Sequence, residues 1–78
     1  NSNQVVVYKD ELNNNLVVNS GNVIMSKIKV FDVRGRLLEE LMDLNATETN
    51  ISCCTENEML LIQVISQDDV LVIKKVVR

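Results

Sequence analysis

Two adjacent cysteines, Cys53 and Cys54, have the most versatile chemistry in this 78-residue chain. In an oxidising compartment they could form a strained vicinal disulfide or bridge two copies of the chain. Consecutive strand residues point to opposite faces, which favours one buried thiol and one near the surface, so a dimer through Cys53 or Cys54 stays open. Because the sequence has no histidine, two cysteines cannot close a zinc site within one chain.

Charged side chains offer two further candidates. Asp68 and Asp69 could hold a hard cation, but two neighbouring ligands are too few for calcium, so a solvated turn is the better interpretation. Arg34 and Arg36 could hold anions, but solvated pairs with acids are the default expectation. The nearby acids are Asp32, Glu39 and Glu40. Without histidine, the chain lacks the side chain that usually acts as a base near neutral pH. We predict that it is not an enzyme and uses no metal or other cofactor.

Length and charge limit the function classes further. The chain has room for one domain, and its aromatic residues are only Tyr8 and Phe31, so the core must be aliphatic. A formal charge of −3 with scattered lysines and arginines argues against nucleic acid. No apolar run approaches the ~18 residues needed to span a bilayer, so membrane insertion is not expected. The missing start methionine suggests a fragment of a longer polypeptide.

Seven short stretches rich in aliphatic residues alternate with polar clusters at a spacing typical of β-sandwiches. They predict an all-β, immunoglobulin-like antiparallel β-sandwich of about seven short strands. The expected strands are Val5–Lys9, Leu16–Ser20, Met25–Val33, Arg36–Met42, Thr47–Cys53, Met59–Ser66 and Val70–Val77. A short amphipathic helix over Leu37–Leu44 is the alternative for the fourth segment.

Turn residues divide these strands. Gly35 lies alone between two β-patterned runs and can adopt the positive φ of a tight hairpin, so Gly35→Val should be damaging. A second hairpin is expected at Gln67–Asp69. In the sixth segment, the alternation places Leu60, Ile62 and Val64 in the core. The last segment is apolar on both faces except for two lysines, so its second face either docks a partner or exposes scattered aliphatic side chains.

Three blocks of the sequence together resemble a known family. The first is Ser26–Leu38 with its aromatic-Asp-x-x-Gly-Arg motif, the second is the polar run Asn45–Glu48, and the third is the basic and aliphatic ending. In this order they resemble the C-terminal sorting domain of the type IX secretion system of Bacteroidetes, over nearly the whole chain. The matching motif residues are Phe31, Asp32, Gly35 and Arg36, and those of the ending are Lys74, Lys75, Val76, Val77 and Arg78.

The chain departs from the commonest form of that family. It has no proline, and Tyr8–Glu11 stands in place of the proline-rich opening. Glu58 and Leu60 replace a glycine and a tyrosine before the penultimate strand. These differences favour the flavobacterial type C variant.

The resemblance implies a folded export signal at the end of a cargo protein that is secreted or displayed on the cell surface after passing through the periplasm. Its partners would be the type IX translocon, the upstream cargo domain in the same polypeptide, and a sortase-like peptidase that removes the domain near residues 1–4, the linker to the cargo. The translocon could read the final hairpin by strand pairing and by the charges of Lys74, Lys75 and Arg78. Alternatively, the two lysines only protect an edge strand. The competing function is that of a structural or adhesive β-sandwich module.

Overall fold

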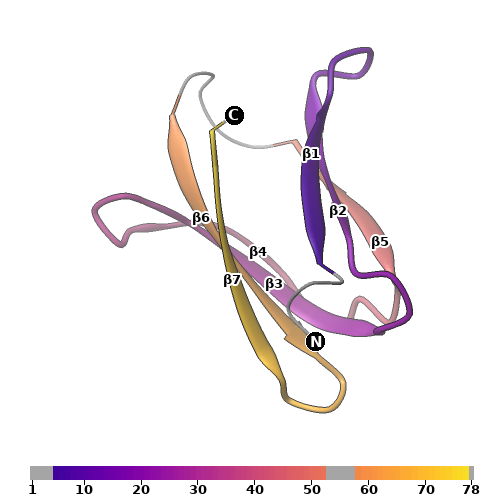
Figure 1. The fold of residues 1–78 in the computed structure, drawn as a ribbon. Helices are drawn as coiled ribbons and strands as arrows, with labels where there is room; N and C mark the ends of the chain where they lie inside the picture. The colour runs from indigo at the N-terminus through magenta and orange to yellow at the C-terminus, as the bar shows by residue number, and fades with distance from the viewer. Residues whose placement is uncertain (1–4, 53–57, 78) are drawn as a thin grey trace.

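A computed structural model describes residues 5–52 and 58–77 of the chain, and all its regular elements are strands. The strands follow one another along the chain as Figure 1 shows. They are β1 (Val6–Asp10), β2 (Asn15–Asn19), β3 (Met25–Asp32), β4 (Leu37–Leu41), β5 (Glu48–Ile51), β6 (Met59–Ser66) and β7 (Leu71–Val77). The predicted all-β class is therefore confirmed.

The strands form two antiparallel sheets that face each other. The three-stranded sheet has the order β1-β2-β5, and the four-stranded sheet has the order β4-β3-β6-β7. This is an immunoglobulin-like sandwich in which the fourth strand pairs with the third instead of joining the sheet of the first two. The sheets meet at one corner, where Met25 forms an isolated bridge with Ala46.

The observed strand boundaries lie within two residues of the predicted ones wherever the structure describes them. β6 coincides with its prediction, whereas Asn15 and Asp10 extend their strands beyond the expected ends. The helical alternative for Leu37–Leu44 is wrong, because β4 pairs with β3 over most of that segment. The hairpin at Gln67–Asp69 is confirmed, since these residues connect β6 to β7.

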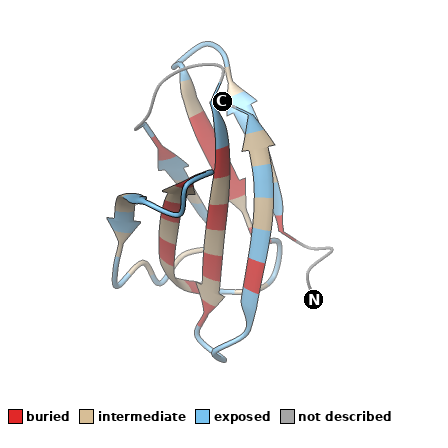
Figure 2. Cartoon of the chain, turned by 90° about the vertical axis from the view of Figure 1, so that its left-hand side faces the viewer, coloured by how far each residue is buried: buried red, intermediate tan, exposed pale blue. Residues whose placement is uncertain are grey.

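An aliphatic core fills the space between the sheets, as predicted from the scarcity of aromatic residues. Figure 2 shows buried bands alternating with more exposed ones along the strands. The predicted inward set of β6 is confirmed, with Leu60, Ile62 and Val64 all buried. The complete buried cluster is Val5, Leu16, Val18, Met25, Ile28, Val30, Ile51, Leu60, Ile62, Val64 and Val72.

Candidate functional site

The Phe-Asp-x-x-Gly-Arg motif forms the turn between β3 and β4. The Asp32 carboxylate is buried, and its Oδ1 accepts the backbone N–H groups of Arg34 and Arg36, both at 2.9 Å. The backbone carbonyl of Asp32 accepts the N–H of Gly35, and the backbone N–H of Asp32 donates to the carbonyl of Arg36. Both distances are 3.0 Å. The aspartate side chain thus holds the turn from inside.

Gly35 occupies the left-handed position of this turn, with a φ of 85°. A Cβ added there would meet nothing within 4 Å, so only backbone strain opposes a larger residue. The sequence prediction of a positive φ at this glycine is confirmed. The requirement for glycine is conformational and does not come from crowding.

Charge reinforces the same turn. The Arg36 Nε lies 3.3 Å from Asp32 Oδ2, while the Arg36 side chain is 70% exposed. Hydrogen bonds from the backbone, led by that of Arg36, outweigh the opposing effect of burial and hold the pKa of Asp32 below its ordinary value of 3.8. The arginine pairs with an acid as expected, although the acid is the buried member of the pair.

The turn between β6 and β7 repeats this geometry residue for residue. Ser66 takes the place of Asp32, and its Oγ accepts the N–H groups of Asp68 and Val70 at 3.2 and 3.1 Å. The Asp69 N–H donates to the Ser66 carbonyl, and the Ser66 N–H donates to the Val70 carbonyl, both at 3.0 Å. Asp69, the counterpart of the glycine, has a φ of 63°. One turn design therefore closes both hairpins of the four-stranded sheet.

A side-chain oxygen also ends β1 and β2. Asp10 Oδ1 accepts the N–H of Leu12 at 3.1 Å, and Asn19 Oδ1 accepts the N–H of Gly21 at 2.8 Å. Such Asx and Ser turns give the chain a hydrogen-bonded reason to leave the strand. Sequence reasoning assigned the β3–β4 turn to Gly35 and missed the role of Asp32. The signal available in the sequence was a residue with a short polar side chain at the end of a strand, which can accept the backbone N–H of the residue two positions later.

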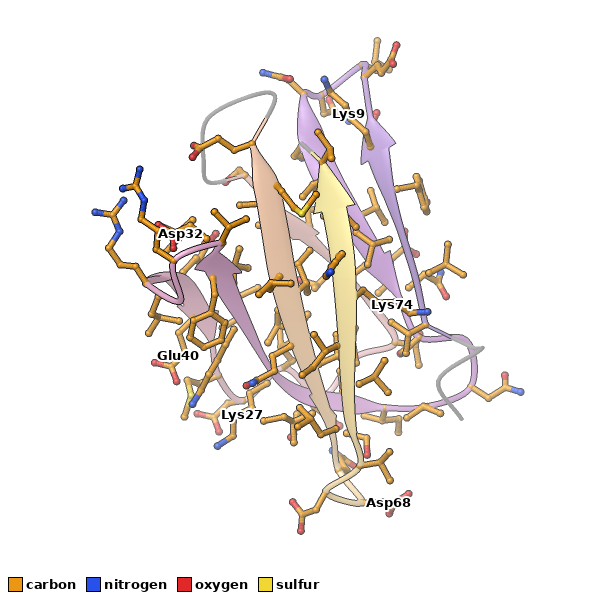
Figure 3. All side chains as sticks on the ribbon, turned by 60° about the vertical axis from the view of Figure 1, so that its left-hand side comes forward. Lys9, Lys27, Asp32, Glu40, Asp68 and Lys74 are labelled. Carbon is orange, nitrogen blue, oxygen red and sulfur yellow. The ribbon has the colours of Figure 1, made fainter. Side chains whose placement is uncertain are left out.

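The predicted C-terminal site lies on β7, an edge strand of the four-stranded sheet. Lys74 pairs with Ile62, whose side chain is fully buried, so Lys74 shares the inward face. Figure 3 shows its side chain extending from β7 toward β1. Lys75 is exposed on the outward face. Val76 is partly buried and packs against the core, Val77 is exposed, and Arg78 lies outside the described residues.

The register aligns the start of the Phe-Asp-x-x-Gly-Arg motif with the C-terminal part of β7. Phe31 pairs with Leu61, which pairs with Lys75, and Asp32 pairs with Leu60, which pairs with Val76. These two rows cross β3, β6 and β7 at the same end of the sheet. Because neighbouring strands lie ~4.8 Å apart, Phe31 and Lys75 are separated by about 10 Å.

Charged side chains point inward on several edge strands. Lys9 on β1 pairs with Leu16, Glu39 on β4 pairs with Val30, and Lys74 has the corresponding position on β7. An inward charge on an edge strand opposes the addition of a further strand, because the extended sheet would bury the charge. The protective role considered for the lysines therefore fits Lys74, whereas Lys75 presents its charge outward.

The remaining candidate residues do not come together in a binding site among the residues that the structure describes. Cys53 and Cys54 lie outside it, so their pairing stays a prediction. Asp68 and Asp69 are exposed in the β6–β7 turn, and no cluster of metal-ligating side chains occurs among the residues described. Within the same residues, no helix is long and apolar enough to cross a membrane.

Comparison with known proteins gives one family for the whole chain. The family model called Domain of unknown function (DUF8694) matches residues 1–78. The chain belongs to the DUF8694 family. No curated protein matches it. In this DUF8694 domain, the described motif residues build a hairpin turn and one end of a sheet, an arrangement that can present a fixed shape to a partner.

Proposed function

We propose that this DUF8694 domain is a C-terminal sorting domain that directs an upstream cargo protein across the outer membrane through the type IX secretion system. The proposal begins with the resemblance of Ser26–Leu38 and of the ending Lys74–Arg78 to such domains. The single observation that supports it most is the register, because it joins the first and third blocks of resemblance at one end of the four-stranded sheet.

In this proposal, recognition depends on the folded end and not on an extended peptide. The turn that Asp32 holds fixes the backbone beside Phe31, and β7 adds Lys75 and Val77 to the same end. Exposed cations on a rigid frame favour a partner with an acidic surface and add specificity to backbone or apolar contacts. The inward Lys74 disfavours pairing along the middle of the β7 edge.

The mature cargo would be released or held at the cell surface, and a sortase-like peptidase would remove the domain near residues 1–4. Polar segments that join domains are the usual sites of proteolysis. Mass spectrometry of the delivered cargo identifies its new C-terminus. A cut inside residues 5–77 would contradict this assignment.

A reporter experiment tests the function. Residues 1–78 are fused to a periplasmic reporter in a bacterium with the type IX machinery, and delivery to the surface or medium is measured. We expect delivery with the complete domain and periplasmic retention with residues 1–73. Retention of the complete fusion would contradict the proposal and favour a structural or adhesive module.

A second pair of variants separates recognition from folding. Lys75→Glu changes an exposed side chain at the proposed recognition end, whereas Val6→Asp changes an exposed side chain on β1 of the other sheet. We expect Lys75→Glu to reduce delivery several-fold and Val6→Asp to leave it unchanged, with both domains folded by circular dichroism. Equal delivery by the two variants would remove Lys75 from the recognition surface.

A further inference from the structure

The outer face of the β6–β7 hairpin carries an apolar stripe that the fold leaves uncovered. On β7, Leu71, Ile73 and Val77 are 52%, 55% and 59% exposed. They pair with Ile65, Gln63 and Met59 of β6, so both strands contribute to one continuous ladder. We call this surface the hairpin face, consisting of Met59, Leu61, Ile65, Leu71, Ile73 and Val77.

Cations border the hairpin face. Lys75 lies within it, opposite Leu61, while Lys27 pairs with Ile65 and Lys29 pairs with Gln63 on the neighbouring strand β3. Within the described strands of this sheet, the acid on the same side is Glu40. Its Oε2 lies 3.8 Å from the Lys29 Nζ. Figure 3 labels Lys27 and Glu40 on this side of the sheet. The side of the hairpin face next to β3 is therefore basic, whereas the exposed Asp68 and Asp69 lie beyond its Leu71 end in the β6–β7 turn.

Size and charge together select the occupant. Two strands are ~10 Å wide and seven residues are ~23 Å long, which matches one helix of about 15 residues better than a second sheet. An area of that size is far below the ~800 Å² per partner of a standard interface, so it does not suit a stable homodimer. A second copy packed on the same face would also bring the lysines of both copies into one interface.

We propose that the hairpin face binds an amphipathic helix whose apolar stripe is flanked by glutamate or aspartate. The apolar side chains of the helix cover Leu71, Ile73 and Val77, and its acids pair with Lys27 and Lys75. This surface shares Lys75 and Val77 with the proposed recognition end, but helix binding requires only the fold and not the secretion machinery. The small area is typical of a weak, transient complex.

A designed peptide is the probe. It is a stapled 15-residue helix, a length of ~23 Å, with leucines along one stripe and glutamates on both flanks, and the matched control has lysine at every glutamate. The chain of residues 1–78 is titrated with each peptide and followed by amide chemical shifts. We expect shifts in β6, β7 and β3 with the glutamate peptide, weaker binding at higher salt, and no binding of the lysine peptide.

Variants connect the binding to the face. Ile73→Asp and Lys27→Glu should each weaken the glutamate peptide at least tenfold, whereas Val6→Asp, equally exposed on the other sheet, should leave it unchanged. Equal binding of the two peptides, or shifts confined to β1, β2 and β5, would overturn the proposal. Binding to phosphatidylglycerol vesicles without binding the glutamate peptide would replace the helix by a membrane surface. Concentration-dependent dimerisation without peptide binding would replace it by a second copy.

Discussion

Lys74 and Ile62 are direct partners in the β6–β7 ladder, and the isoleucine is fully buried. A lysine therefore points toward the interior side of an edge strand, and its side chain extends from β7 toward β1 (Figure 3). Glu39 has the same relation to the buried Val30 on the opposite edge of the sheet. Both edges of the four-stranded sheet are thus marked by an inward charge.

The first prediction concerns self-association through these edges. Lys74→Val should make the domain associate with itself, because a neutral inward residue no longer opposes the addition of another strand. Sedimentation velocity over a range of concentrations measures the effect. Lys75→Gln is the control, because it removes a positive charge from the outward face of the same strand without adding to the apolar hairpin face, and it should not increase association. Association of both variants to the same extent would point to lost charge in general.

The second prediction concerns the two equivalent turns. Gly35→Ala should lower the free energy of unfolding by about 1 to 2 kcal/mol, because alanine is strained at a φ of 85° even though there is room for its methyl group. Urea unfolding provides the measurement.

Asp69→Gly tests the same geometry in the opposite direction. Asp69 has a positive φ at the corresponding position, so glycine should relieve strain and leave stability unchanged or raise it by up to about 1 kcal/mol. Destabilisation by Asp69→Gly similar to that of Gly35→Ala would show that the two turns are not energetically equivalent.

Much of the fold could be predicted from the sequence because local pattern and burial agree. Aliphatic alternation marked β6 at both ends and its inward face, and the lone Gly35 marked a hairpin. That hairpin also predicted the pairing of β4 with β3, which the five-residue turn from Asp32 to Arg36 brings about. The pairings of β3 with β6 and of β2 with β5 could not be predicted in this way, because these strands are distant in the sequence and no turn connects them.

The candidate site was harder to predict than the fold. The residues of the motif block were identified from resemblance, but their physical role depends on atoms that no periodicity describes, such as the Asp32 oxygen that accepts two turn amides. The equivalence of Ser66 to Asp32 was also hidden, since a hydroxyl and a carboxylate perform the same task in turns of different sequence.

The third prediction separates core from surface on the final hairpin. Leu60→Ala should lower the free energy of unfolding by about 2 to 5 kcal/mol, because it leaves a cavity at a fully buried position. Ile73→Ala should change it by less than about 0.5 kcal/mol, because that side chain is more than half exposed. Urea unfolding measures both free-energy changes, and the dependence of the unfolding free energy on urea (the m-value) should stay the same in the variants. A large loss with Ile73→Ala would mean that the outer face is already covered in the free domain.

The fourth prediction is a loss of stability in acid caused by Asp32. Its pKa is lowered in the folded state, chiefly by the hydrogen bond from the Arg36 backbone, so its stabilising effect is complete above the ordinary pKa of 3.8. That stability should decline as the pH falls below 3.8 and disappear below the lowered folded pKa. Thermal unfolding measured across this range should show a shallower acid loss in Asp32→Asn, whose Oδ1 can still accept the turn amides but cannot titrate.

Asp10 provides the comparison for this pH effect, because a side-chain hydrogen bond from Asn13 is the main cause that lowers its pKa as well. Asp10→Asn should remove a separate part of the acid loss, and the two substitutions should add, since they hold turns at the ends of different sheets. A domain whose acid unfolding is unchanged by both substitutions would require other carboxylates to control it. In that case the turn held by Asp32 would depend on geometry and not on charge.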